Sequence, residues 1–135
     1  MPSVQSSYTT PASTITTTTE TLAANIPALP LSEPGGAPQS VIVRFTIYLT
    51  TGTSTAQMKA QLRLGQNNTT TNPIGQPIQT QSGAGAGFAI SGHFVDPAGS
   101  VNLPNSGYSL TITQAAASAN GTINAVFWEV DYSSH

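Results

Sequence analysis

A strict alternation of apolar and polar side chains is the feature that most constrains how this chain folds. Residues 41–50, VIVRFTIYLT, place every second side chain on one apolar face, and residues 58–64, MKAQLRL, repeat the pattern with Lys59, Gln61 and Arg63 pointing outward. Successive side chains of a β-strand point to opposite faces, whereas a helix would show apolar residues at intervals of three and four. The helical interval does not appear from residue 41 onward. We therefore expect this region to be all β.

Further strand-like segments follow at intervals, separated by loops rich in Gly, Asn and Pro. They are residues 74–81, 83–95, 108–114 and 122–134. The first of them can form only a short or edge strand, because Pro77 has no backbone N–H to donate. If residues 13–22 add one edge strand, the chain has seven or eight strands, a number typical of an antiparallel β-sandwich or jelly roll.

Residues 1–40 differ from the rest, because a Ser/Thr tract passes into the proline-rich segment IPALPLSEPGGAP. Proline removes a backbone donor and fixes φ, so this stretch is not expected to be an interior strand or a helix. Composition alone favours a disordered tail. We expect instead an extended N-terminal arm over residues 1–40, followed by a sandwich domain over residues 41–135. The arm would dock onto its own domain or onto a neighbouring subunit through Leu22, Ile26, Pro27, Leu29, Pro30 and Leu31.

Charge and cysteine content exclude several classes of function. Only 6% of residues are charged, the formal net charge is -2, and Arg44, Lys59 and Arg63 are the only basic residues. So few cations cannot neutralise a row of phosphates or bind an anionic membrane surface. The absence of cysteine excludes disulfides and cysteine zinc sites. We also expect no secretory signal and no transmembrane segment, because the N-terminus lacks a basic and an apolar region and no apolar run is long enough to span a bilayer.

Two pairs of residues are candidates for chemistry, and both have a simpler interpretation. His93 and Asp96 are too few for a zinc site, and an Asp-Pro pair commonly begins a turn. Glu129 and Asp131 share a strand face, as paired acids do in a glycosidase. An exposed face, or a partner for Arg44 or Arg63, is the favoured interpretation. We therefore predict no catalytic residues, no metal site and no cofactor, and a protein that is not an enzyme.

The aromatic residues of the last strand point to both of its faces. Trp128 and Tyr132 are the best candidates for binding a sugar ring, but Val126 and Val130 complete the same stripe, so a core position is favoured. Phe127 lies on the opposite face. An apolar residue there indicates a candidate subunit interface.

The layout as a whole resembles small jelly-roll-like virion proteins of tailed bacteriophages, both head decoration proteins and the tips of head or tail fibres. The resemblance covers roughly residues 40–132 and is one of pattern and composition. It is carried by an apolar, Thr-rich arm followed by VIVRFTIYLTTGT, QLRLGQ, FVDPAG, YSLTITQ and NGTINAVFWEVDYS.

That resemblance implies a non-enzymatic virion component on the capsid surface, often a homotrimer, whose N-terminal segment attaches to the major capsid protein or to neighbouring copies. A capsid decoration or cement protein is the first choice, and deleting residues 1–35 should then leave a folded domain that no longer binds particles. The alternative is a receptor- or carbohydrate-binding module at a fibre tip, acting through loops 66–72 and 96–107.

Overall fold

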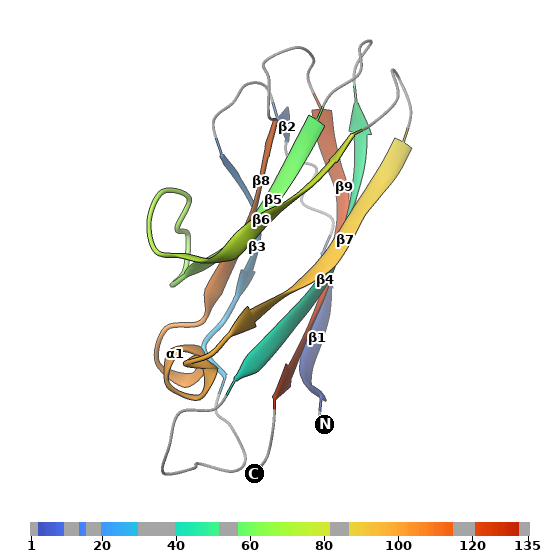
Figure 1. Cartoon of the computed structure of the whole chain (residues 1–135). Helices are drawn as coiled ribbons and strands as arrows, with labels where there is room; N and C mark the ends of the chain where they lie inside the picture. The colour runs from blue at the N-terminus through green and yellow to red at the C-terminus, as the bar shows by residue number, and fades with distance from the viewer. Residues whose placement is uncertain are drawn as a thin grey trace.

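The computed structural model is a sandwich of two β-sheets that face each other, with one short helix at one end (Figure 1). It describes residues 3–9, 14–15, 20–29, 40–51, 57–81, 87–114 and 121–132. Among these, several side chains are not described, including those of residues 3–9 and 14–15 and those of Phe88 and Tyr132. The elements are β1 (Ser3–Thr9), β2 (Thr14–Ile15), β3 (Thr21–Ile26), β4 (Val41–Thr51), β5 (Gln57–Leu64), β6 (Pro73–Gln81), β7 (Gly87–Asp96), α1 (Gly99–Asn105), β8 (Tyr108–Gln114) and β9 (Gly121–Tyr132).

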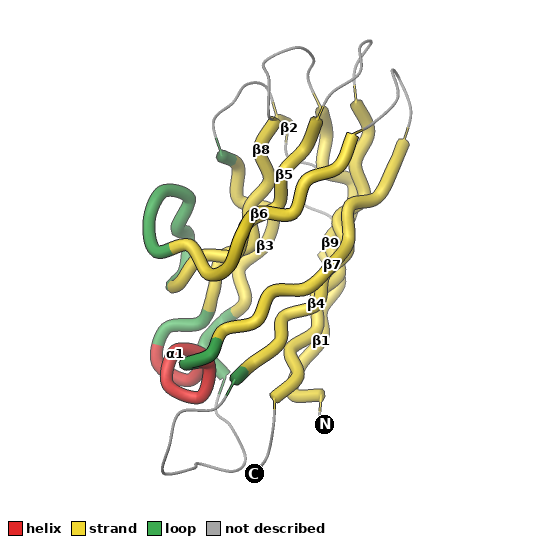
Figure 2. Tube along the Cα trace, viewed as in Figure 1, coloured by secondary structure: helices red, strands yellow, loops and turns green. Residues whose placement is uncertain are grey.

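The order of the strands is that of a jelly roll. One sheet has the order β1-β9-β4-β7, with β2 also pairing with β9, and the other has the order β3-β8-β5-β6. Every pair is antiparallel, and among the described pairs only β5 and β6 follow each other in the chain. The chain therefore crosses repeatedly from one sheet to the other, as Figure 2 shows, in the arrangement of a two-sheet jelly roll of eight strands. The predicted fold class is confirmed, and β2 adds a ninth, two-residue strand to the described set.

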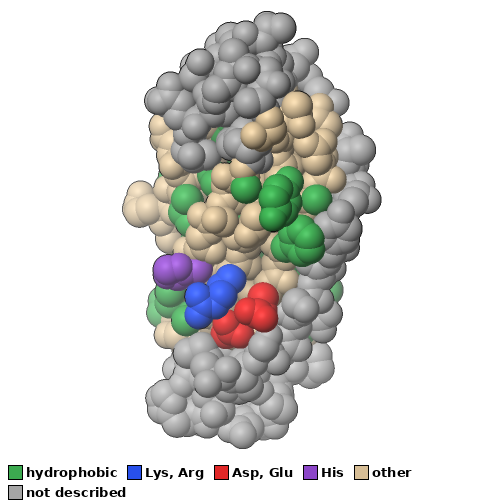
Figure 3. Space-filling model, turned by 90° about the vertical axis from the view of Figure 1, so that its right-hand side faces the viewer, with side chains coloured by type: hydrophobic (Ala, Val, Ile, Leu, Met, Phe, Trp, Pro, Cys, Tyr) green, Lys and Arg blue, Asp and Glu red, His purple; other side chains and the backbone are tan. Residues whose placement is uncertain are grey.

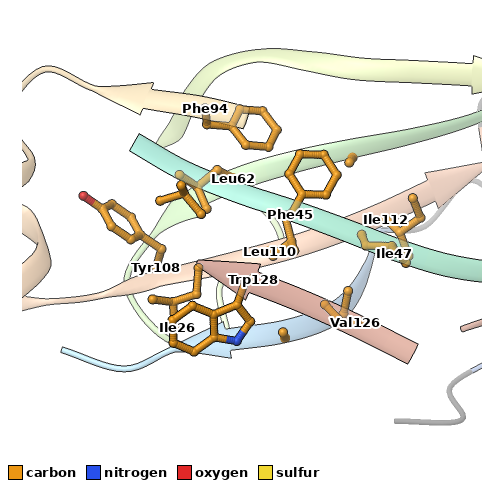
Figure 4. Packing of buried hydrophobic residues seen from close by; sticks show 14 of the residues in the cluster. Ile26, Phe45, Ile47, Leu62, Phe94, Tyr108, Leu110, Ile112, Val126 and Trp128 are labelled. Atoms are coloured by element: carbon orange, nitrogen blue, oxygen red, sulfur yellow. The ribbon is translucent and has the colours of Figure 1, made fainter. Parts of the chain in front are cut away.

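The core lies between the sheets and is made of the stripes that alternation predicted. Val41, Val43, Phe45, Ile47 and Leu49 are all at most 4% exposed, as are Met58, Ala60 and Leu62 of β5, Ile90 and Phe94 of β7, and Tyr108, Leu110 and Ile112 of β8. The rings of Phe45 and Phe94 stack across neighbouring strands with their centroids 5.4 Å apart (Figure 4). Trp128 is 4% exposed, so its predicted core position is confirmed.

The helix α1 is the one element after residue 41 that sequence analysis did not expect. It follows β7, and its seven residues include Pro104. So short a helix buries only Gly99 and Leu103, and two buried positions are too few to show a helical period. The prediction that the region after residue 41 has no helix is therefore wrong at this one place.

Described parts of the segment expected to be an arm are strands of the two sheets. β1 and β2 pair with β9, and β3 pairs with β8. Ile26 is fully buried in the protein's own core, and Leu29 packs against that core and donates its backbone N–H to the carbonyl of Leu103 (3.3 Å). β3 ends at Ile26, directly before Pro27, which has no N–H to continue a strand.

Ile26 thus docks onto the protein's own body and is not available to another subunit. Leu22 is half-buried and Pro27 is exposed, while Pro30 and Leu31 lie outside the described residues. The division of the chain into domains at residue 40 stays a prediction. Deleting residues 1–35 would remove β1, β2 and β3, so the expectation that this deletion leaves a folded domain no longer follows.

Gln61 was predicted to be an outward residue of its strand, and the structure encloses it there. Its side chain is 8% exposed at a register shift between β5 and β6. The Nε2 amide donates to the carbonyls of Leu62, Ile74 and Gly75 at 3.0, 3.3 and 3.2 Å. A register shift interrupts the ladder of backbone hydrogen bonds, and the amide of Gln61 supplies donors there. β6 is the last strand of its sheet, as Pro77 predicted.

Candidate interaction surface

The outward side of the β1-β9-β4-β7 sheet is the strongest candidate for a functional surface. Residues that alternate with the buried core positions on β9, β4 and β7 point outward there, and we call this set the β4 face. It comprises Ala125, Phe127, Glu129 and Asp131 of β9, Ile42, Arg44, Thr46 and Tyr48 of β4, and Ala89, Ser91, His93 and Val95 of β7. Antiparallel register places these residues in cross-strand rows.

Two aromatic rings lie exposed on the β4 face and pack against each other. Tyr48 is 45% exposed and Phe127 is 41% exposed, and their rings meet edge to face with centroids 5.8 Å apart. Such pairs contribute about 0.5–1.5 kcal/mol beyond the area that they bury. Of the four large hydrophobic residues exposed within the described part of the chain, three lie on this face, Val95 being the third and Val101 of α1 the exception. A cluster of this kind on one face indicates an interaction surface.

An ionic row lies next to the aromatic pair. Arg44 stands in register with Glu129 on one side and with His93 on the other, and its Nε donates to Oδ2 of Asp131 at 2.8 Å. Figure 3 shows histidine, basic and acidic side chains side by side on this face, with hydrophobic side chains gathered beyond them. The expectation that an acid of β9 pairs with Arg44 is confirmed for Asp131. Arg44 is half exposed, whereas the carboxylate of Asp131 is only 10% exposed, so the pair is partly buried.

The outward side of the other sheet is polar and bonded within the chain. Arg63 donates from Nε and Nη2 to the two carboxylate oxygens of Glu20 at 2.6 and 2.8 Å, and Thr111 donates to Glu20 at 2.8 Å. Burial opposes ionisation of Glu20, but the hydrogen bonds from Arg63 and Thr111 and the charges of Arg63 and Lys59 outweigh it and lower the pKa of Glu20. The same hydrogen bond raises the pKa of Arg63. None of the large hydrophobic residues that are exposed within the described part of the chain lies on this side.

Hydrogen bonds of its own asparagines fix the conformation of loop 66–72, to which the alternative prediction assigned receptor binding. The side-chain amide of Asn68 donates to the carbonyls of Leu64 and Thr71, and its oxygen accepts from the backbone of Thr70 and Thr71. Asn67 exchanges hydrogen bonds with Asn25 of β3 at 2.8 and 2.9 Å. These amides hold the shape of the loop.

Loop 96–107 is organised around Asp96, which is 3% exposed. Its carboxylate accepts hydrogen bonds from the backbone N–H of Ala98, from Nδ2 of Asn102 and from the hydroxyl of Tyr108, at 3.0, 2.9 and 2.7 Å. Burial, then the hydrogen bond to Asp96, raises the pKa of Tyr108 beyond its ordinary range. The prediction that Asp96 begins a turn is confirmed, since the bond to Ala98 closes that turn. His93 lies exposed on the β4 face, apart from this network.

Two absences hold for the described residues alone. Nowhere among them do three or more His, Cys, Asp or Glu side chains gather as a metal site would require. No helix in the same part of the chain is long and apolar enough to cross a membrane.

Comparison with known proteins relates the chain to virus structures. No protein-family model and no curated protein matches it. Among solved structures it is similar to a chain from infectious bursal disease virus, strain Gx, with a TM-score of 0.54 and 12% identity over 95% of this chain and 32% of that one. A chain of the T13 viral particle of the same virus gives 0.52 and 13% identity over 95% and 31%, respectively. The chain therefore spans about a third of the length of these neighbours. At such identity the likeness shows a shared fold, the jelly-roll sandwich.

Proposed function

We propose that this protein is a non-enzymatic structural component of a virus particle. The observation that carries the proposal is the strand order of both sheets, a jelly roll whose solved neighbours are chains of virus structures. Jelly rolls also occur in lectins and cupins, and a fold does not by itself specify a function. Support for a structural role therefore also has to come from the surface of this chain.

The β4 face supports a role in assembly. It presents the Tyr48–Phe127 pair and Val95 on a sheet of long strands, whereas the outward groups of the other sheet are bonded within the chain. A subunit of a shell is held by many repeated contacts, each of which can be weak because avidity adds them. Burial of apolar area at about 25 cal/mol per Å² would supply those contacts.

Within this role we favour a decoration or cement protein of a tailed-phage head that forms homotrimers and binds the major capsid protein. Leu22 and Pro27 of the predicted arm, which are half-buried and exposed, would contact the shell together with Pro30 and Leu31, which lie outside the described residues. Ile26 is not among these contacts, since it belongs to the core.

The test is to purify particles from the natural source on a density gradient and to measure the chain by quantitative mass spectrometry. We expect it to sediment with the particles at a fixed ratio to the major shell protein, and an image of the particle should place it on the head. A decoration protein should also dissociate under conditions that leave the shell intact. If the chain is found only outside particles, the proposed function is wrong.

A carbohydrate-binding module of a fibre tip is the second candidate. The observation that favours it is the exposed Tyr48–Phe127 pair, because aromatic rings with polar neighbours can stack on a sugar. Binding on a glycan array that is lost in Tyr48→Ala, together with an image that places the chain at a fibre end, would support this candidate over decoration.

A further inference from the structure

The β4 face is large enough to form most of an interface between two proteins. Strands rise about 3.4 Å per residue and lie about 4.8 Å apart, so ten residues on each of β9, β4 and β7 make a footprint of about 500 Å² before side-chain relief is counted. β1 widens the same sheet beyond β9. A stable interface of standard size buries about 800 Å² on each partner. A partner that covers this face therefore has to be a protein surface of similar size.

The large side chains of the β4 face stand next to small ones in the same cross-strand rows. Tyr48 is in register with Ala125, and Phe127 is in register with Thr46. A twofold axis that runs parallel to the strands, midway between β4 and β9, lays β4 of one copy over β9 of the other. Under that operation Tyr48 meets Ala125 of the second copy, and Phe127 meets Thr46. Each large side chain thus faces a small one, as close packing between two sheets requires.

The same twofold operation also brings opposite charges of the two copies together. Arg44 is in register with Glu129, so the axis brings Arg44 of each copy over Glu129 of the other. The Arg44 side chain is 51% exposed although its Nε bonds Asp131, which leaves its outer guanidinium nitrogens accessible to a second carboxylate. The row beyond pairs Ile42 with Asp131, whose carboxylate is already bonded to Arg44 of its own chain. Complementary charges fix the register of an interface more than they add affinity.

We propose that the β4 and β9 rows of the β4 face bind the same rows of a second copy of this chain, about a twofold axis parallel to the strands between β4 and β9, which also lays β7 of each copy over β1 of the other. The two inner sheets of the dimer then pack with their strands aligned, as in a β-sandwich. This inference rests on the proposed function only in that a virion component acts through repeated copies. A threefold contact made elsewhere on the molecule is compatible with it.

The first experiment measures self-association of the purified full chain by sedimentation equilibrium. We expect a dimer in the micromolar range or tighter, the range of standard interfaces. Phe127→Ala and Tyr48→Ala should each raise the dissociation constant by about thirty-fold, the effect of losing a central aromatic contact. Val101→Ala is the matched control, because Val101 is 47% exposed but lies on α1. That variant should dimerise as well as the unchanged chain.

The second experiment exchanges the charges of the row. Arg44→Glu alone and Glu129→Arg alone each place like charges across the axis, so both should be largely monomeric at concentrations where the unchanged chain dimerises. An equimolar mixture of the two variants restores both opposite-charge contacts and should form heterodimers, as should the double variant with itself. Thermal unfolding checks that each variant is folded. If Arg44→Glu does not fold, Phe127→Ala and its control carry the test.

Any of four results would overturn the inference. The chain could stay monomeric well above the micromolar range, or Val101→Ala could lose as much association as Phe127→Ala. The mixture of charge variants could stay monomeric, or the chain could be a monomer whose β4 face binds glycans. These results are distinct from a failure of the proposed function. A chain that dimerises but is absent from particles contradicts only the virion role, and one that enters particles as a monomer contradicts only the twofold contact.

Discussion

Replacement of Ile26 by alanine tests whether the N-terminal segment is part of the body of the protein. Ile26 is fully buried and belongs to the core cluster between the sheets (Figure 4). The change removes about three methylene equivalents, worth about 0.8 kcal/mol each, and leaves a cavity where the surroundings do not collapse. We therefore expect the free energy of unfolding to fall by about 2–5 kcal/mol. That is a large fraction of the roughly 5–15 kcal/mol that stabilises a typical domain.

The measurement is urea unfolding of both chains, followed by tryptophan fluorescence, since Trp128 is in the same core. The midpoint should fall while the slope stays unchanged, because the area exposed on unfolding is nearly the same. Val101→Ala, at an exposed position, should change stability by less than about 0.5 kcal/mol. If Ile26→Ala is as stable as that control, then Ile26 does not belong to the folded core and the segment behaves as a separate arm.

Three further predictions concern the hydrogen bonds of Glu20, the hydrogen bond between Tyr108 and Asp96, and Gly107. Because the folded-state pKa of Glu20 is lowered, its bonds to Arg63 stabilise the fold at pH values above the ordinary pKa of 4.5, and this stabilisation is lost as the pH falls through the lowered pKa. Urea midpoints measured down to this pH range should show that loss of stability. The variant Glu20→Gln should not show it. Tyr108→Phe removes a hydrogen bond to the buried carboxylate of Asp96 and should cost about 1.5–3 kcal/mol in urea unfolding, whereas an unchanged midpoint would mean that the bond contributes nothing net. Gly107 has a φ of 68° and an added Cβ would meet the carbonyl oxygen of Ile26, so Gly107→Ala should lower the free energy of unfolding by more than about 1 kcal/mol; a melting temperature equal to that of the unchanged chain would contradict this.

Apart from α1, the features that sequence analysis missed depend on contacts between distant segments. Ile26 follows a polar tract and precedes a proline, so nothing nearby shows that β8 pairs with its strand. Gln61 alternates as an outward residue should, yet a register shift against β6 encloses it. Tyr48 and Phe127 belong to different segments, and only the pairing of β4 with β9 brings their rings together. A signal in the sequence existed for both rings, because a large aromatic residue on the outward face of an alternating strand is unusual, but the sequence analysis used it for Phe127 and not for Tyr48.

The amino-acid sequence by itself determined the local direction of the side chains. Alternation in segments such as residues 41–50 specified which side chains of each strand are buried, because geometry along one strand forces successive residues to opposite faces. Alternation therefore predicted the all-β class and the core position of Trp128, and Pro77 predicted the edge position of β6. Only the tertiary structure decided which strands are neighbours, which register they take and which outward residues share a row. Those choices come from packing and hydrogen bonding between segments far apart in the chain, and they assemble the β4 face.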